Sequence, residues 1–66
     1  MRYEFIVAGT LSEPVEAELP GMSSAPYPTG GTAIFGTIQD EADAMSLLAR
    51  INALGLAVVE MRQLPD

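Results

Sequence analysis

Two prolines separated by one residue, Pro26 and Pro28, restrict the fold of this chain more than any other feature. In a β-strand, residues i and i+2 direct their backbone nitrogens to the same edge, and proline has no N–H to donate there. A strand that contains both prolines can therefore pair on one side only. We expect the segment Met22–Thr29 to be an edge strand, followed by a turn at Gly30 and Gly31.

The chain is also short: it has 66 residues, with no cysteine and no histidine. Folding at this length buries only about 60% of the unfolded surface, and without cysteine no disulfide can add stability. We expect a single domain over residues 1–66 that gains stability by forming a homo-oligomer, most simply a dimer. The same absences exclude thiol and imidazole catalysis and leave only oxygen ligands for a metal. We therefore predict no cofactor and no metal site.

The charge balance restricts the choice of partner. Nine acidic residues against three basic ones give a net charge of −6, which disfavours nucleic acid because phosphate contacts need lysine and arginine. A hydrophobic fraction of 48% excludes intrinsic disorder. No apolar run is long enough to span a membrane, and the first residues do not form a signal peptide. We expect a cytoplasmic protein whose partner is itself or another protein.

Periodicity and end signals assign the remaining segments. Alternating apolar residues predict strands over Arg2–Ala8, Thr32–Ile38 and Ala57–Leu64, and helical spacing predicts helices over Thr10–Leu19 and Asp40–Leu54. With the proline strand, the order is β-α-β-β-α-β, which predicts an α+β, ferredoxin-like fold. That fold has a four-stranded antiparallel sheet in the order 4-1-3-2 and both helices on one face. The alternative is a βββαβ sheet in which residues 10–19 form an extended connection.

Capping residues support the two helices unequally. Asp40 is a good N-cap for the second helix, and Gly55 with Leu56 is typical of a Schellman end. The first helix has two possible caps, Thr10 and Ser12, and only about two turns. In the third strand, Gly36 indicates a bulge or a close approach of another segment.

Strand alternation also separates the two faces of the sheet. The side covered by the helices is expected to hold Tyr3, Phe5, Val7, Thr32, Ile34, Val59 and Met61. The opposite side then presents an apolar patch, surrounded by Glu4, Glu60 and Arg62. The patch consists of Ile6, Ala8, Ala33, Phe35 and Val58. An exposed patch of this kind marks an interaction site, so we expect two sheets to pack back to back in a dimer.

No cluster of side chains has the composition of a catalytic or metal site. Glu4 and Arg62 are interpreted as a cross-strand ion pair on the surface rather than an acid–base pair. Asp40, Glu41 and Asp43 lack the ligand spacing of a calcium loop and are explained by helix capping. We therefore predict no catalytic residues.

Two resemblances to known families extend this interpretation. The βαββαβ order is similar to that of ACT-type regulatory domains, which bind small ligands, often amino acids, near the first strand–helix loop. The matching positions here are Gly9, Thr10, Leu11 and Ser12. Separately, the segment Gly36–Asp40, followed by Leu54-Gly55-Leu56, resembles short uncharacterised bacterial proteins in which a Gly-x-Val/Ile-x-Asp turn leads into a helix that ends in Leu-Gly-Leu. This second resemblance supports the fold.

The sequence thus favours a small non-catalytic module for protein interaction or regulation, which associates with itself through its open sheet face. One alternative is a metabolite-sensing module that holds a small ligand at Gly9–Ser12. Another is a small dimeric enzyme for a hydrophobic substrate, with Tyr27 or a carboxylate on the sheet as the acid.

Overall fold

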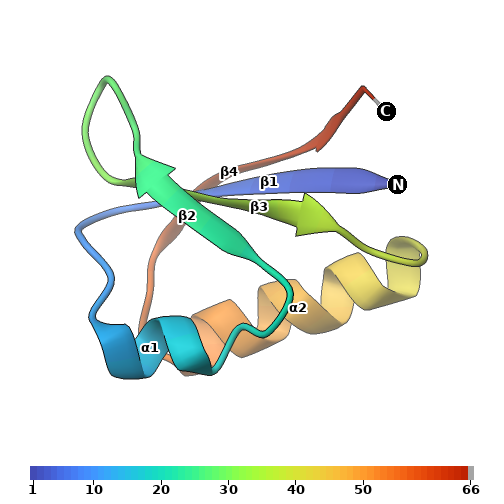
Figure 1. Cartoon of the computed structure of the whole chain (residues 1–66), viewed down its shortest axis with the longest axis horizontal. Coiled ribbons are helices and arrows are strands. Elements are labelled where there is room, and N and C mark those ends of the chain that lie inside the picture. The colour runs from blue at the N-terminus through green and yellow to red at the C-terminus, as the bar shows by residue number, and fades with distance from the viewer. Residues whose placement is uncertain (66) are drawn as a thin grey trace.

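A computed structural model describes residues 1–65 and has an α+β architecture with an open, four-stranded antiparallel sheet. The elements are, in order, β1 (Arg2–Val7), α1 (Glu13–Ala17), β2 (Ser23–Pro26), β3 (Thr32–Thr37), α2 (Glu41–Ala53) and β4 (Val58–Leu64). The strands lie in the order β2-β3-β1-β4, which reads β4-β1-β3-β2 from the other edge. Both helices lie on the same side of the sheet (Figure 1). None of the described helices is long and apolar enough to cross a membrane.

The proline strand lies at an edge of the sheet, as predicted, but it is shorter than expected. β2 ends at Pro26, and Pro28 lies in a turn closed by the Gly30 N–H, which donates to the Tyr27 carbonyl at 2.9 Å. The Tyr27 N–H donates to the Gly31 carbonyl at 3.1 Å, on the side of β3. By alternation, the nitrogen of Pro26 faces the unpaired edge, where a missing N–H breaks no bond within the sheet.

The long second helix confirms the sequence signals at both of its ends. The Asp40 side chain accepts a hydrogen bond from the Asp43 N–H at 2.9 Å, so Asp40 is the N-cap. At the other end, the Gly55 N–H donates to the Asn52 carbonyl and the Leu56 N–H donates to the Ile51 carbonyl. These two bonds form the predicted Schellman motif.

The first helix is much shorter than the predicted helix over residues 10–19. It is the five-residue segment Glu13–Ala17, and the Glu18 N–H then donates to the Val15 carbonyl, three residues back. The Met22 N–H donates to the Leu19 carbonyl, which closes a β-turn. An isolated helix of this length is unstable in water, so the turn that buries Leu19 in the core determines where the helix ends.

The core lies between the sheet and the helices. It contains Tyr3, Phe5, Val7, Leu19, Ile34, Ala44 and Ile51. In β3, Gly36 marks a close approach rather than a bulge, because a Cβ there would lie 2.8 Å from the Met22 Sδ and 3.0 Å from the Gly21 carbonyl oxygen. The bulge is instead in β4, where the register with β1 shifts between Ile6 and Val7.

Candidate functional site

The side of the sheet away from the helices has an apolar centre formed by cross-strand neighbours. Ile6 pairs with Ala33, and Ala33 pairs with Ala25 of β2. Phe35 lies two residues after Ala33 and therefore on the same face. We call these four residues, Ile6, Ala25, Ala33 and Phe35, the open-face row. Ile6 and Ala33 are only 4% and 5% exposed, although neither helix covers them, whereas Ala25 and Phe35 are half-buried.

One of the five residues predicted for this face, Val58, lies on the other side of the sheet, and Ala8 lies at the margin of the open face, beside the same hollow as Ile6. Val58 packs against the core on the helix side, because the bulge leaves Val59 without a partner and pairs Val58 directly with Val7. The predicted face assignments of Val58 and Val59 are therefore reversed, and Val59 is 70% exposed. Ala8 lies just beyond the end of β1 and is exposed, with its N–H donating to the Ala57 carbonyl at 3.0 Å.

An ion pair borders the open-face row at its β4 end. The Arg62 Nε donates to the Glu4 Oε1 at 2.7 Å, across directly paired positions of β1 and β4. The hydrogen bond that Arg62 donates to Glu4, and then the negative charge of Glu4, raise the pKa of Arg62 above its ordinary value. The Glu4 side chain is 13% exposed and that of Arg62 52% exposed. The pair is thus a positioned surface contact, as the sequence suggested.

Tyr27, which the sequence offered as an edge-strand residue and as the acid of a possible enzyme, also belongs to this face. It continues the alternation of Ala25 and lines a shallow hollow of about 490 Å³ together with Ile6, Val59 and Glu60. Its hydroxyl is close enough to contribute to the raised pKa of Arg62. The spacing of two residues from Ala25 is the signal that could have placed Tyr27 on the open face.

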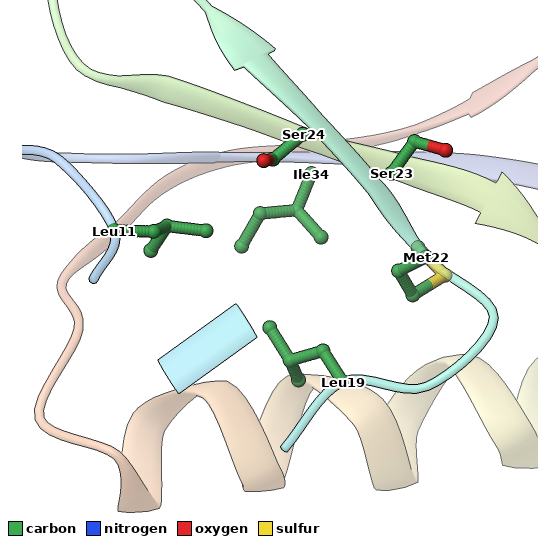
Figure 2. A pocket seen from close by; sticks show the side chains of 6 residues that line it. All are labelled: Leu11, Leu19, Met22, Ser23, Ser24 and Ile34. Atoms are coloured by element: carbon green, nitrogen blue, oxygen red, sulfur yellow. The ribbon is translucent and has the colours of Figure 1, made fainter. Parts of the chain in front are cut away.

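The predicted ligand loop borders a pocket on the other side of the sheet. Leu11 lines a pocket of about 160 Å³ between the strands and the end of α1 (Figure 2). The other lining residues are Leu19, Met22, Ser23, Ser24 and Ile34. The pocket exists because α1 makes only one turn, and so leaves part of β2 and β3 uncovered. Leu19 and Ile34 form an apolar floor, and Ser24, which is paired with Ile34, lies near its rim, whereas the Ser23 hydroxyl points away from the pocket (Figure 2).

The four loop residues do not meet at this pocket. Thr10 lines a neighbouring depression with Pro26 and Thr32, and Gly9 lines the hollow beside Tyr27. Ser12 lines neither of these depressions nor the 160 Å³ pocket. The Gly9 carbonyl accepts a hydrogen bond from the Thr32 hydroxyl at 2.7 Å, which fixes the loop to the start of β3. Of the predicted ligand-binding residues, only Leu11 therefore contributes to the more enclosed pocket.

Among the acidic side chains that the structure describes, no group of three comes close enough to hold a metal ion. Asp40 and Asp43 are joined by the capping hydrogen bond at the start of α2. The open-face row has no titratable side chain among its four members. This arrangement combines an apolar row on the open face, whose outer members Ala25 and Phe35 are half-buried, with a small apolar pocket on the helix side.

Comparisons with known proteins give one match. Neither the curated proteins nor the solved structures contain a match to this chain. A family model described as a domain of unknown function, DUF8691, matches residues 2–62, which include all six elements except the last two residues of β4. The chain therefore belongs to the DUF8691 family.

Proposed function

We propose that this protein is a small non-catalytic module that associates with itself through its open sheet face, and that it acts by interaction with, or regulation of, a partner protein. The observation that carries the proposal is the open-face row, an apolar centre on the side of the sheet that neither helix covers. Two sheets that face each other pack about 10 Å apart and bury such side chains between them. We also assign the fold as ferredoxin-like, with a first helix reduced to one turn.

The distribution of charge supports a face-to-face dimer. The apolar residues occupy the inner two strands and β2, while Glu4, Glu60 and Arg62 lie toward β4. An apolar centre with a polar rim is the usual anatomy of a protein interface. Phe35 is the largest side chain of the row and is half-buried, so it has both area and accessibility for a contact with a second copy.

The experiment compares Phe35→Lys with Met45→Lys by sedimentation equilibrium. Phe35 lies opposite Glu4 in the register, so a lysine there gains a cross-strand partner in the single chain but is costly to bury between two sheets. Met45 is 52% exposed on α2, in the helix layer, and serves as the matched control. We expect wild type and Met45→Lys to have the same assembly mass, and Phe35→Lys to have a smaller one. A folded Phe35→Lys variant with the wild-type mass would contradict the proposal.

A second candidate function, sensing of a small neutral molecule, is favoured by the pocket beside Leu11. An engineered apolar cavity of about 150 Å³ binds benzene, and this pocket has a similar volume of about 160 Å³ with the Ser24 side chain near its rim (Figure 2). The net charge of −6 disfavours an anionic ligand. The ligand class is therefore a small, uncharged, mainly apolar molecule with one polar group.

Phenol is a suitable probe for this second candidate. We expect millimolar phenol to shift the amide NMR signals of Leu11, Leu19 and Ile34 and to raise the melting temperature of the protein. Leu11→Trp fills the pocket and should abolish both effects, while Met45→Lys keeps them. The absence of any shift at these three amides in the wild-type protein would exclude the pocket as a site for molecules of this class.

A further inference from the structure

The two edges of the sheet differ in a way that indicates how a second copy can be added. At the β2 edge, Pro26 presents a nitrogen without a proton, which blocks strand addition. β4 is the other edge strand, and its seven residues, Val58–Leu64, include no proline. Within residues 1–65, no strand lies beyond β4. An unblocked strand of this length is a template for another extended segment.

Hydrogen bonds elsewhere in the sheet determine which groups β4 directs outward. The Met1 ammonium and the Ile38 N–H each donate to the carbonyl of the other residue, so Met1 faces β3. By alternation, Glu4 faces β4, and its partner Arg62 directs its backbone groups inward, toward β1. The next residues on either side of Arg62, namely Met61 and Gln63, direct their N–H and carbonyl groups outward.

We propose that β4 pairs with β4 of a second copy of this chain, antiparallel about a two-fold axis at Met61, to form a continuous eight-stranded sheet. Met61 is the midpoint of β4, and the residues on either side of it, Glu60 and Arg62, keep a regular register with β1. Because Met61 directs its backbone groups outward, the two Met61 residues exchange both of their hydrogen bonds across the axis. The interface is isologous, as a two-fold dimer requires.

In this register the side chains of β4 complement themselves. Glu60 lies opposite Arg62 of the second copy, and the axis generates the same pair twice. Opposite charges at directly paired positions stabilise a sheet, and like charges there destabilise it. Axes at Glu60 or Arg62 would instead place two carboxylates or two guanidinium groups opposite each other.

In the proposed pairing, Arg62 of the Glu4–Arg62 ion pair also faces a carboxylate of the second copy. Arg62 already donates to Glu4 on the inner side, and it is 52% exposed on the other. The Glu4–Arg62 contact is the one ion pair among the described side chains, and the charge of Glu60 also acts on Arg62 within the same chain. The proposed pairing produces a row in which Arg62 lies between Glu4 and Glu60 of the second copy.

This edge contact is separate from the face contact proposed above and does not depend on it. The edge uses the backbone of β4, whereas the face uses the open-face row, centred on Ile6 and Ala33. If both contacts form, the assembly contains four chains. Substitutions at one surface should then leave the other contact in place.

The test uses two charge variants, each of which should weaken the edge dimer alone, whereas their mixture should restore it. Glu60→Lys places an ammonium group opposite Arg62 of the second copy. The double variant Glu4→Arg with Arg62→Glu places a carboxylate opposite Glu60 of the second copy, while it keeps an inner ion pair. We expect each variant alone to form the edge dimer about tenfold more weakly than wild type, because two favourable pairs become two repulsive ones. A one-to-one mixture restores both pairs and should form a heterodimer at wild-type strength.

Native mass spectrometry resolves the mixed dimer by its mass, and the measurement is made with and without Phe35→Lys to separate the edge from the face. A statistical mixture of masses, with no preference for the heterodimer, would refute the edge pairing even if the face proposal holds.

A backbone test is independent of charge: Gln63→Pro removes an outward N–H, and Gln63→Ala, which keeps it, is the control. We expect Gln63→Pro to remove the edge dimer and Gln63→Ala to leave it unchanged, with both variants folded by circular dichroism. Equal dimerisation of the two variants would also overturn the pairing.

Discussion

Gly31 is the position at which a single added methyl group should be most damaging. Its φ angle is 85°, and a Cβ there would overlap the Val7 carbonyl oxygen at the end of β1. Gly9 provides a close control, because its φ angle is 83° and no atom lies within 4 Å of an added Cβ. A comparison of Gly31→Ala with Gly9→Ala therefore separates the clash from the backbone strain.

The expected magnitudes follow from these two terms. A left-handed conformation costs an L-residue about 1–2 kcal/mol, so Gly9→Ala should lower the free energy of unfolding by that amount. In Gly31→Ala the added methyl group also overlaps the Val7 carbonyl, which is part of the backbone and cannot rotate away, and overpacking of this kind costs a further ~1–3 kcal/mol. For a chain of 66 residues, total stability is about 3–10 kcal/mol, so the combined loss at Gly31 could unfold the protein.

Urea denaturation at one fixed protein concentration measures both variants, since self-association would otherwise change the apparent stability. We expect Gly31→Ala to unfold at a clearly lower urea concentration than Gly9→Ala. Equal losses in the two variants would refute the reasoning, because they would mean that β3 does not start against the Val7 carbonyl.

Two further predictions concern single polar contacts. Asp40→Ala should lower the free energy of unfolding by about 1 kcal/mol because the N-cap is lost, while Asp40→Asn should have little effect. The midpoints of urea denaturation measure both variants, and equal losses of stability would contradict the capping role of Asp40. Because the pKa of Arg62 is raised in the folded state, its pairing with Glu4 stabilises that state fully at any pH below the pKa that Arg62 has in the unfolded chain. This stabilisation is lost only as the pH rises through the higher pKa that Arg62 has in the folded chain. The difference in unfolding free energy between wild type and Arg62→Gln should therefore be constant from about pH 7 to about pH 9, and a drift over that range would contradict it.

Elements with strong local signals were predictable from the sequence. The cap at Asp40 and the end at Gly55 and Leu56 define α2 because each signal acts on neighbouring residues only. Pro26 identified an edge strand in the same way, since proline affects its own backbone nitrogen. The α+β class and the antiparallel sheet follow from these elements and from the apolar alternation of the strands.

Features that depend on tertiary contacts were not predictable. Thr10 and the spacing of Leu11 and Leu19 indicated a two-turn helix, but the turn after Leu19 and the short length leave a single turn. The pattern of Val58 and Val59 gives no sign of a bulge, because either valine can face the core and the choice depends on the register with β1. The candidate interface therefore lost Val58, and Tyr27 of the turn after β2 lies beside it.

The uncovered surfaces of the domain are a consequence of its length. Two helices on one side of the sheet form the whole core, and no further segment within residues 1–65 remains to cover the open-face row or the edge of β4. Pro26 blocks the β2 edge, so the surfaces left for association are one face and one edge, which meet along β4. Enclosed chemistry needs a cavity surrounded by the chain, and the pocket beside Leu11 holds only about 160 Å³. Within residues 1–65 the edge of β4 has no partner strand, and this unpaired edge is the feature that the proposed self-association would satisfy.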